Sequence, residues 1–233
     1  MRLNTFALSF PIAGLILLSS IGAFANSLTS GNCIGQSTAA CPGSLDVFSN
    51  TPGLFLAGVS TGITTATYAG TLTSAVYRNA AGTLDFYYQF SNSAGSLESV
   101  ARITNISFLG FLTDVGYRTT DIDGVAGNMF GGVNVNFDAG VQAPGAADRS
   151  ASGGTIGFSF DKAAEADKIN QGEASRILVI KTNAMNFTTG TTNVIDGSIG
   201  AVSTFAPSAV PEPATMGLMG LSLIGLALAR RKK

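Results

Sequence analysis

The chain has 233 residues, a formal net charge of −1, 45% hydrophobic residues and only 12% charged residues. It contains no histidine, the commonest general base and metal ligand near neutral pH, so catalysis by a histidine of this chain is excluded. Between residues 26 and 213, leaving out Glu212, 8 basic and 13 acidic residues give a charge of −5, and the lack of a basic patch excludes a nucleic-acid-binding protein.

Residues 1–25 predict a secretory signal peptide. Arg2 supplies the positive charge, an apolar stretch follows, and Ala23 and Ala25 form a small-residue cleavage site. We therefore expect an N-terminal signal helix that the secretion translocon recognises and signal peptidase removes, so that the mature chain begins at Asn26. An uncleaved anchor helix is the alternative.

The next segment, residues 26–45, holds the two cysteines of the chain, Cys33 and Cys41. Export would place them in an oxidising compartment, where a disulfide is the default. A metal pair is the alternative, but two thiolates without a histidine or further cysteines cannot complete a zinc site. We therefore predict a disulfide that closes a short loop.

Residues 26–202 as a whole predict one all-β domain. Apolar and polar residues alternate with a period of two in several stretches, as expected of strands with one buried face. The run Ile177–Ile180 is apolar on both faces and predicts a central strand. The other predicted strands lie near residues 54–60, 71–78, 84–90, 100–108, 133–137, 156–160 and 193–195.

Short turns separate these strands, and Gly82 occupies the tight position of a hairpin-like turn. Many short strands with glycine-rich turns indicate an antiparallel β-sandwich, of the jelly-roll or Ig-like kind. We expect an exposed loop over residues 141–155, a short helix or loop over residues 161–169, and a proline-containing linker over residues 203–213.

The C-terminal region predicts a single membrane-spanning helix. Residues 214–229 are 16 residues without a charge, about 24 Å long as a helix. That is shorter than the ~20 residues of a typical spanning helix, but a thinned bilayer or snorkelling cations could close the gap. The positive-inside rule then keeps the body outside the cytoplasm, with these cations inside: Arg230, Arg231, Lys232 and Lys233. A buried core helix is the alternative.

The residues just before that run carry a resemblance. Together with the apolar run and the final cations, this part of the chain resembles the sorting region of the PEP-CTERM family of exported bacterial proteins. The matching residues are Val210, Pro211, Glu212, Pro213 and Ala214. The resemblance implies a sorting tag over residues 210–233 that an exosortase recognises in the membrane and removes, after which the protein is released or moved to the cell surface.

The middle of the chain resembles the recurring extracellular domain of many PEP-CTERM proteins, through "SAVYRNAAGTLDFYYQFSN", "VGYRTTD" and "RILVIKTNAMNFTTGTTNVIDGS". This resemblance implies a β-sandwich and no particular chemistry. By the same resemblance, the expected setting is the extracellular polysaccharide matrix or a biofilm.

Motifs for catalysis do not form a working set. Residues 58–62 match G-x-S-x-G, but that motif needs a strand-to-helix turn and a histidine. Residues 194–198, "VIDGS", are similar to one aspartic-protease loop, but that chemistry needs two such aspartates. A carboxylate pair for hydrolysis could come from distant parts of the chain, and it stays open as the less favoured alternative.

Calcium is the one cofactor for which the sequence offers ligands. "TDIDGVAGN" and "NVNFD" supply oxygen-bearing side chains, although neither follows the EF-hand pattern. The alternatives are an Asx-type turn and the solvated face of a strand. We therefore expect no cofactor, with calcium as the alternative. The candidate ligands are Asp121, Asp123 and Asn128, and in a second array Asn134, Asn136 and Asp138.

A carbohydrate-binding module is the alternative to a purely structural role. Sugar-binding surfaces use exposed aromatic faces, and Tyr87 lies on the polar face of its predicted strand. The alternative for Tyr87 is packing against a loop or a neighbouring strand. We predict a non-enzymatic surface or matrix protein whose partners are the export machinery, the exosortase and an exopolysaccharide.

Overall fold

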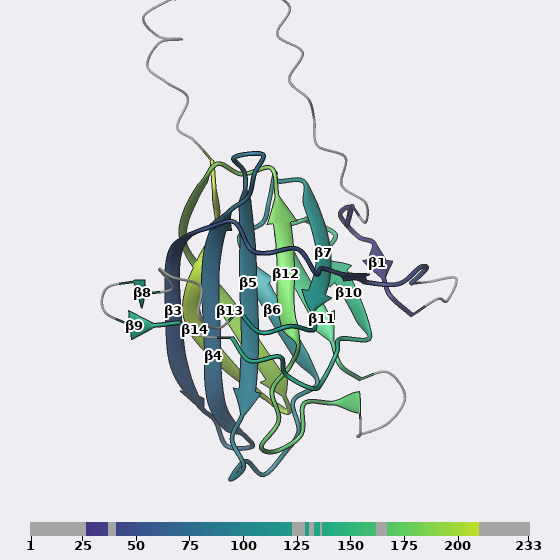
Figure 1. Ribbon diagram of the computed structural model, residues 1–233. Helices are drawn as coiled ribbons and strands as arrows, with labels where there is room; N and C mark the ends of the chain where they lie inside the picture. Colours follow the sequence, from purple (N-terminus) through teal and green to yellow (C-terminus); the bar gives the residue numbers. More distant parts are fainter. Residues whose placement is uncertain are drawn as a thin grey trace, which may run out of the picture.

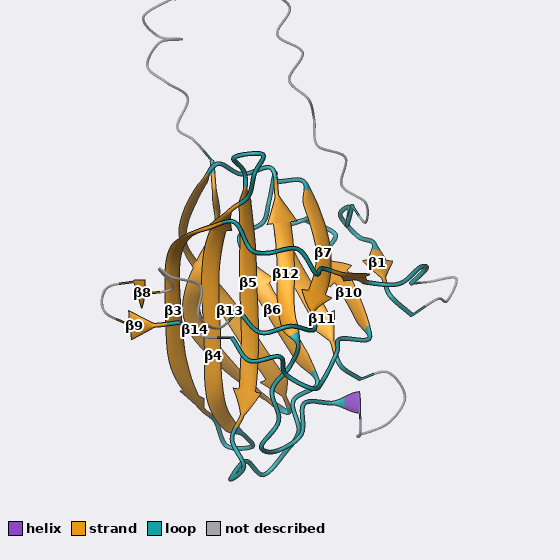
Figure 2. Ribbon diagram, viewed as in Figure 1, coloured by secondary structure: helices purple, strands orange, loops and turns teal. Residues whose placement is uncertain are grey.

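The structure is a computed structural model that describes residues 27–36, 41–122, 129–130, 133–135, 137–161 and 167–209. Apart from a short helical piece at Asp167, the described elements are β-strands (Figure 2). The predicted all-β class is therefore confirmed. The described strands form two six-stranded sheets and one small two-stranded sheet (Figure 1).

The first sheet, which we call sheet A, contains the central strand predicted from the apolar run. β12 lies between β7 and β5 and pairs with both in antiparallel fashion. The short strand β2 adds to β7 in parallel at one edge. From edge to edge the strands are β2 (Asp46–Val47), β7 (Thr113–Arg118), β12 (Ile177–Thr182), β5 (Leu84–Asn92), β4 (Ala69–Arg78) and β3 (Leu54–Thr64).

The second sheet, sheet B, is antiparallel in each of its described pairings. A third sheet joins only two residues from each of two neighbouring stretches, β8 (Met129–Phe130) and β9 (Val133–Asn134). From edge to edge the strands of sheet B are β1 (Cys33–Ile34), β10 (Ala146–Arg149), β11 (Thr155–Ser159), β6 (Arg102–Ile106), β13 (Asn186–Asp196) and β14 (Ser198–Ser208).

The hydrophobic core lies between sheets A and B. The alternation of β5 turns Phe86, Tyr88 and Phe90 inward, where they are fully buried with Phe158 and Val194 of sheet B. Burial of such side chains contributes about 1.5–3 kcal/mol each relative to leaving them in water. The period-two pattern therefore determines which face of β5 meets the other sheet.

The outer face of sheet A is covered as well, which the sequence pattern did not indicate. Residues of the long connection after β7 pack on it, and Val135 and Phe137 form a second buried cluster with Tyr77 and Tyr87. Sheet A therefore lies between sheet B on one face and this connection on the other, and both of its faces carry buried side chains.

Two segments expected outside the sheets are strands, so those predictions are wrong in part. The expected loop 141–155 contains β10, which lies between β1 and β11 and is largely buried. The expected linker 203–213 is strand up to Ser208, because β13 pairs with β14 along its whole length. Pro207 is tolerated there because β14 is an edge strand, where a missing N–H need not break a ladder.

Two further expectations are met only in part. The strand expected over residues 133–137 is limited to Val133–Asn134, and the helix or loop expected over residues 161–169 falls mostly on residues outside the described ones. The hairpin turn at Gly82 is confirmed, since its φ of 82° is the left-handed conformation that glycine adopts freely.

The strands run between two ends of the domain, the exit end and the far end. The exit end comprises the turn 79–83, the loop 107–112, the loop 183–185 and Ser208, where the described chain is about to end. The far end comprises the turn 65–68, the loop 93–99, the loop 170–175 and Gly197. The first described residue, Ser27, bridges to Asp114 near the exit end, so both described termini lie at this end (Figure 1).

Candidate functional site

The candidate sorting segment follows a strand that is held firmly to the domain. β14 pairs with β13 until Ser208 lies opposite Asn186. The Tyr88 hydroxyl donates to the Phe205 carbonyl at 2.6 Å, and the rings of Phe187 and Phe205 meet edge to face with centroids 5.6 Å apart. The folded domain therefore continues to within two residues of Val210.

The two targeting signals themselves lie outside the described residues. Within the part of the chain that is described, no helix combines the length and the apolar character needed to cross a membrane. The signal helix over residues 1–25 and the spanning helix over residues 214–229 stay predictions. The named residues concerned are Ala23, Ala25, Asn26, Val210, Pro211, Glu212, Pro213, Ala214, Arg230, Arg231, Lys232 and Lys233.

The predicted disulfide is confirmed. Cys33 and Cys41 are bonded, with their Cα atoms 4.8 Å apart. Cys33 belongs to β1, which pairs with β10, so the bond ties the segment at Cys41 to the edge of sheet B. An open groove of about 420 Å³ lies nearby, and of its described lining residues only Tyr117 carries an ionisable side chain. The described lining of this groove therefore contains no pair of acidic and basic side chains.

Tyr87 is not an exposed sugar-binding platform, so that interpretation is wrong. It is buried, with its ring centroid 4.8 Å from that of Tyr77 and 6.4 Å from that of Phe137. Burial raises the pKa of the Tyr87 hydroxyl, the nearby Asp85 adds to this, and Arg118 opposes it. The covering segment on the outer face of sheet A is the reason, and the alternative of packing against a loop is the correct one.

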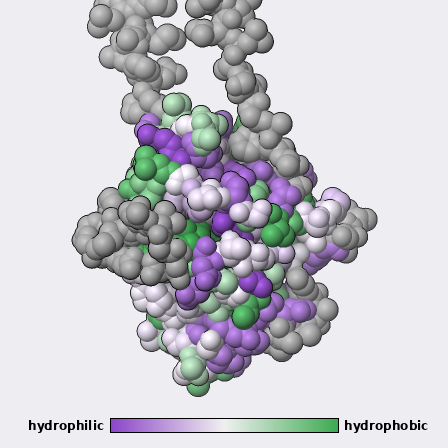
Figure 3. All heavy atoms as spheres, viewed as in Figure 1, coloured by the Kyte–Doolittle hydropathy of each residue, from purple (hydrophilic) through white to green (hydrophobic). Residues whose placement is uncertain are grey.

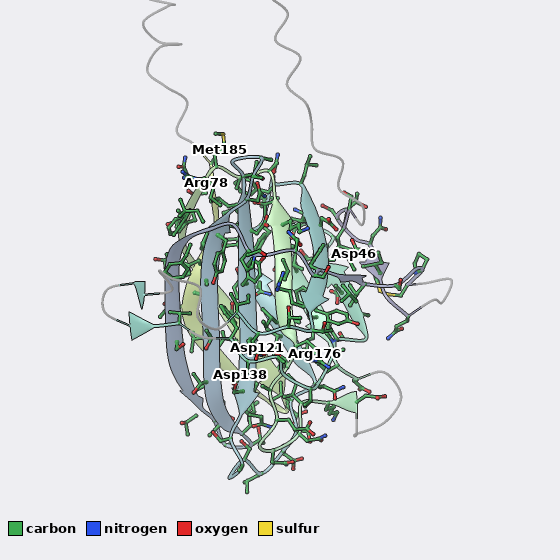
Figure 4. The ribbon with its side chains drawn as sticks, in the orientation of Figure 1. Asp46, Arg78, Asp121, Asp138, Arg176 and Met185 are labelled. Atoms are coloured by element: carbon green, nitrogen blue, oxygen red, sulfur yellow. A yellow bond between two sulfur atoms is a disulfide. The ribbon has the colours of Figure 1, made fainter. Side chains whose placement is uncertain are left out.

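The calcium arrays are only partly described. Asp121 and Asp138 are exposed, while Asp123, Asn128 and Asn136 lie outside the described residues, as does the side chain of Asn134. The Arg176 guanidinium donates to the carbonyls of Thr119 at 3.4 Å and Ala139 at 3.1 Å, and Figure 4 shows it near Asp121. A cation from the chain itself therefore bonds the backbone beside both arrays. In the described part, no three acidic, histidine or cysteine side chains form a group that could hold a metal.

Two buried aspartates come closest to a carboxylate pair. Asp85 of β5 and Asp114 of β7 lie opposite Lys181 of β12 from its two sides. Strands are about 4.8 Å apart, so the two backbones are separated by roughly 10 Å with Lys181 between them. Lys181 also lies 3.7 Å from the centroid of the Phe48 ring. Lys181 therefore lies between the two carboxylates, and its charge lowers the pKa of the Asp85 carboxyl.

The Asp85 carboxyl is strongly perturbed. Burial raises its pKa from 3.8 to about 6, and Asp114 adds to the rise, whereas a hydrogen bond from Asn79 at 2.8 Å and the charge of Lys181 lower it. Perturbed acids can mark active sites, but structural ion networks perturb pKa values too. Asp85 is 3% exposed, and its raised pKa makes the folding stability depend on pH.

The two protease-like strings are ordinary sheet elements. Residues 58–62 lie inside β3, where the Ser60 hydroxyl is 2.9 Å from that of Thr73 on β4. Residues 194–198 form the tight turn between β13 and β14, with Gly197 at a φ of 62°. Neither string forms the turn that its catalytic motif requires.

Arg149 is an organising residue that sequence reasoning missed. It is buried on β10 and donates to the carbonyls of Leu28 at 3.0 Å and Phe108 at 2.8 Å. Further bonds reach the carbonyls of Gly153 and Phe111 and the Thr113 hydroxyl. Burial lowers the pKa of its guanidinium. This one side chain joins both sheets and the N-terminal segment, whereas in the sequence it stood in a stretch expected to be loop.

Comparison with known families places a sorting motif directly after this domain. Residues 209–232 match the PEP-CTERM protein-sorting motif. Neither the curated proteins nor the solved structures give a match. The matched stretch begins one residue after Ser208, the last residue of β14.

Proposed function

We propose that this chain, which carries the PEP-CTERM protein-sorting motif, is a non-enzymatic exported protein that an exosortase sorts to the cell surface. The observation that carries the proposal is the motif at residues 209–232, placed at the end of a folded β-domain. The motif is the recognition tag for an exosortase and indicates an exported protein at the cell surface. The β-domain is then the exported part of the protein, and residues 209–232 are its sorting signal.

The proposed route follows the physical chemistry of the two signals. The signal peptide starts export, residues 214–229 hold the chain in the membrane as a helix, and the Arg230–Lys233 cluster keeps the end of the chain in the cytoplasm. The exosortase then cuts near the Pro-Glu-Pro residues and releases an antiparallel β-sandwich, of the jelly-roll or Ig-like kind, to the surface. We expect the exopolysaccharide matrix or biofilm to be its destination.

Several features support a structural role over catalysis or sugar binding. The chain has no histidine, and the two aspartates nearest to a pair flank a lysine whose ammonium lies over the Phe48 ring. The tyrosine expected to stack on sugars is buried. The carbohydrate-binding module and the carboxylate-pair hydrolase therefore receive no support from named residues.

Intact-mass measurement on the exported protein tests the proposal. In a host that contains an exosortase, we expect the mature mass to lack residues 1–25 and a C-terminal piece that begins near Val210. Replacing Glu212→Gln should leave the C-terminal piece attached and the protein in the membrane fraction. Ser208→Ala, one residue before the matched stretch, is the control and should be processed normally. A full-length chain in the cytosol, or Glu212→Gln processed like the parent, would contradict the proposal.

A further inference from the structure

We propose that the exit end of the domain contacts the lipid surface of the outer leaflet while the C-terminal segment is anchored. The contact would be made by a rim of exposed apolar side chains, Leu54, Leu109, Leu112 and Met185, which we call the exit rim. This inference rests on the proposed function, since it requires residues 214–229 to insert into a membrane.

The exit rim is a continuous feature of one end. Leu54 is opposite Arg78 at the start of β3, and Arg78 lines an open hollow with Gly82 and Met185. The Asn183 side chain, two residues before Met185, accepts a hydrogen bond from the Leu112 backbone at 2.9 Å. These contacts connect strand, turn and loops in one band, and Figure 4 shows Arg78 and Met185 together at the end where the described chain stops.

The four side chains of the exit rim are largely exposed. Leu54 is 66% exposed, Leu109 68%, Leu112 46% and Met185 60%. Half of the eight exposed large apolar side chains that the structure describes thus lie at this one end. Figure 3 shows weakly hydrophobic residues at the tip of the same end. Scattered exposed leucines are ordinary, but their clustering around one exit point indicates a contact surface.

The charge of this end fits a bilayer of anionic and zwitterionic lipids. The loops 79–83, 107–112, 150–154 and 183–186 contain no charged residue. Arg78 is an exposed cation at their border. Of the acids next to these loops, Asp85 and Asp114 are buried on sheet A, and Asp148 is half-exposed but paired with Arg102. No acidic group of these loops would have to lose water or face lipid phosphates, and both costs are what normally keep a protein surface off a membrane.

The length of chain after β14 brings this end to the membrane. Six residue steps separate Ser208 from Ala214, where the apolar run begins, and a fully extended chain of that length spans at most about 22 Å. The headgroup region of one leaflet takes up about 5–8 Å of that distance. Since β14 has eleven residues and is therefore about 36 Å long, the domain cannot turn its far end to the bilayer without a much longer tether.

The lack of tryptophan in the chain makes a direct test possible. Single tryptophans are placed at Met185→Trp and Leu112→Trp in the rim, and at Leu97→Trp as the matched control, a leucine 75% exposed at the far end. A fourth variant, Leu221→Trp, reports insertion of the apolar run itself. The tag-bearing chain is reconstituted into vesicles of phosphatidylethanolamine and phosphatidylglycerol, with and without acyl chains brominated close to the headgroup.

The expected result is loss of tryptophan fluorescence in brominated vesicles for the two rim variants and for Leu221→Trp, with no loss for Leu97→Trp. Quenching of Leu221→Trp alone would overturn the rim contact and leave the anchoring intact. An unquenched Leu221→Trp would instead contradict the membrane anchoring on which the proposed function rests. A blue-shifted but unquenched rim tryptophan would indicate that a second copy of this chain covers the rim and would also overturn the inference.

Discussion

The exit end and the far end of the domain are built from different chemistry. The exit end has uncharged loops, exposed apolar side chains and one buried arginine that bonds the carbonyls around it. The far end has exposed or half-exposed charges, such as Glu98 and Glu173, and an ion pair of 3.8 Å between Lys168 and Asp196. Both ends have exposed apolar side chains, since Leu97 and Ile199 are exposed at the far end, so the two ends differ chiefly in their charged residues.

The ends also differ in how their backbones are satisfied. At the far end, several polar side chains each bond a few backbone groups. Asn92 donates to the carbonyls of Glu98 and Ile169, and the Tyr68 hydroxyl bonds both Val194 and Gly200. At the exit end, Arg149 alone bonds four carbonyls. Loss of one side chain should therefore harm the exit end much more than the far end.

The largest effect is expected from Arg149→Met. The change removes the guanidinium donor from four carbonyls, of which Leu28 keeps the Thr113 hydroxyl and Phe108 keeps the Phe111 N–H. We expect the free energy of unfolding to fall by about 3–5 kcal/mol. Urea denaturation followed by circular dichroism measures it. Arg102→Met is the control, because Arg102 forms a half-exposed ion pair with Asp148 at 2.7 Å and should cost less than about 1 kcal/mol. An equal loss of unfolding free energy in Arg149→Met and Arg102→Met would show that the exit end does not depend on its arginine more than the rest of the domain does.

A pH series on Asp85→Asn tests the buried charge row near the exit end. Because the folded-state pKa is raised from 3.8 to about 6, the folded protein keeps a proton on Asp85 that the unfolded chain has already lost. Stability should therefore fall as the pH rises through this window, by at most about 3 kcal/mol, and this contribution should be constant above it. Asp85→Asn should lack this fall. Parallel stability curves for the two proteins from pH ~4 to ~7 would show that the carboxyl is not perturbed.

Removal of the disulfide should have the next largest effect. For the nine residues from Cys33 to Cys41, the chain-entropy model gives about 2.6 kcal/mol. We expect Cys33→Ser with Cys41→Ser to lower the stability by about 2–3 kcal/mol while β12 and β5 keep their hydrogen-exchange protection, since the loop lies at the edge of sheet B. Loss of protection in the central strands would show that the staple is required by the whole domain.

The smallest effect is expected at the far end, from Tyr68→Phe. The change removes one hydroxyl that donates to Val194 and accepts from Gly200 at 2.9 Å, which should cost about 1–2 kcal/mol. Tyr88→Phe is the matched variant nearer the exit end, since its hydroxyl bonds Phe205. Thermal denaturation compares them. A loss for Tyr68→Phe as large as that for Arg149→Met would mean that the far end also depends on one side chain.

The sequence by itself determined the features that depend on local pattern. The alternation of apolar and polar residues predicted which face of β5 meets sheet B. The run Ile177–Ile180, apolar on both faces, predicted that β12 is a central strand. Export to an oxidising compartment predicted the disulfide between Cys33 and Cys41. The sorting motif could be recognised from the sequence for the same reason, because a glutamate between two prolines before an apolar run is a short continuous pattern.

Only the tertiary structure decided what depends on partners far away in the chain. Tyr87 looked exposed because its strand alternates, but a segment some fifty residues later covers that face. β10 and the end of β14 have no apolar alternation of their own and become strands because neighbouring strands satisfy their backbones. The role of Arg149 and the position of the exit rim follow likewise from loops that meet only in the folded domain, because side-chain burial and backbone pairing depend on distance in space rather than on distance along the chain.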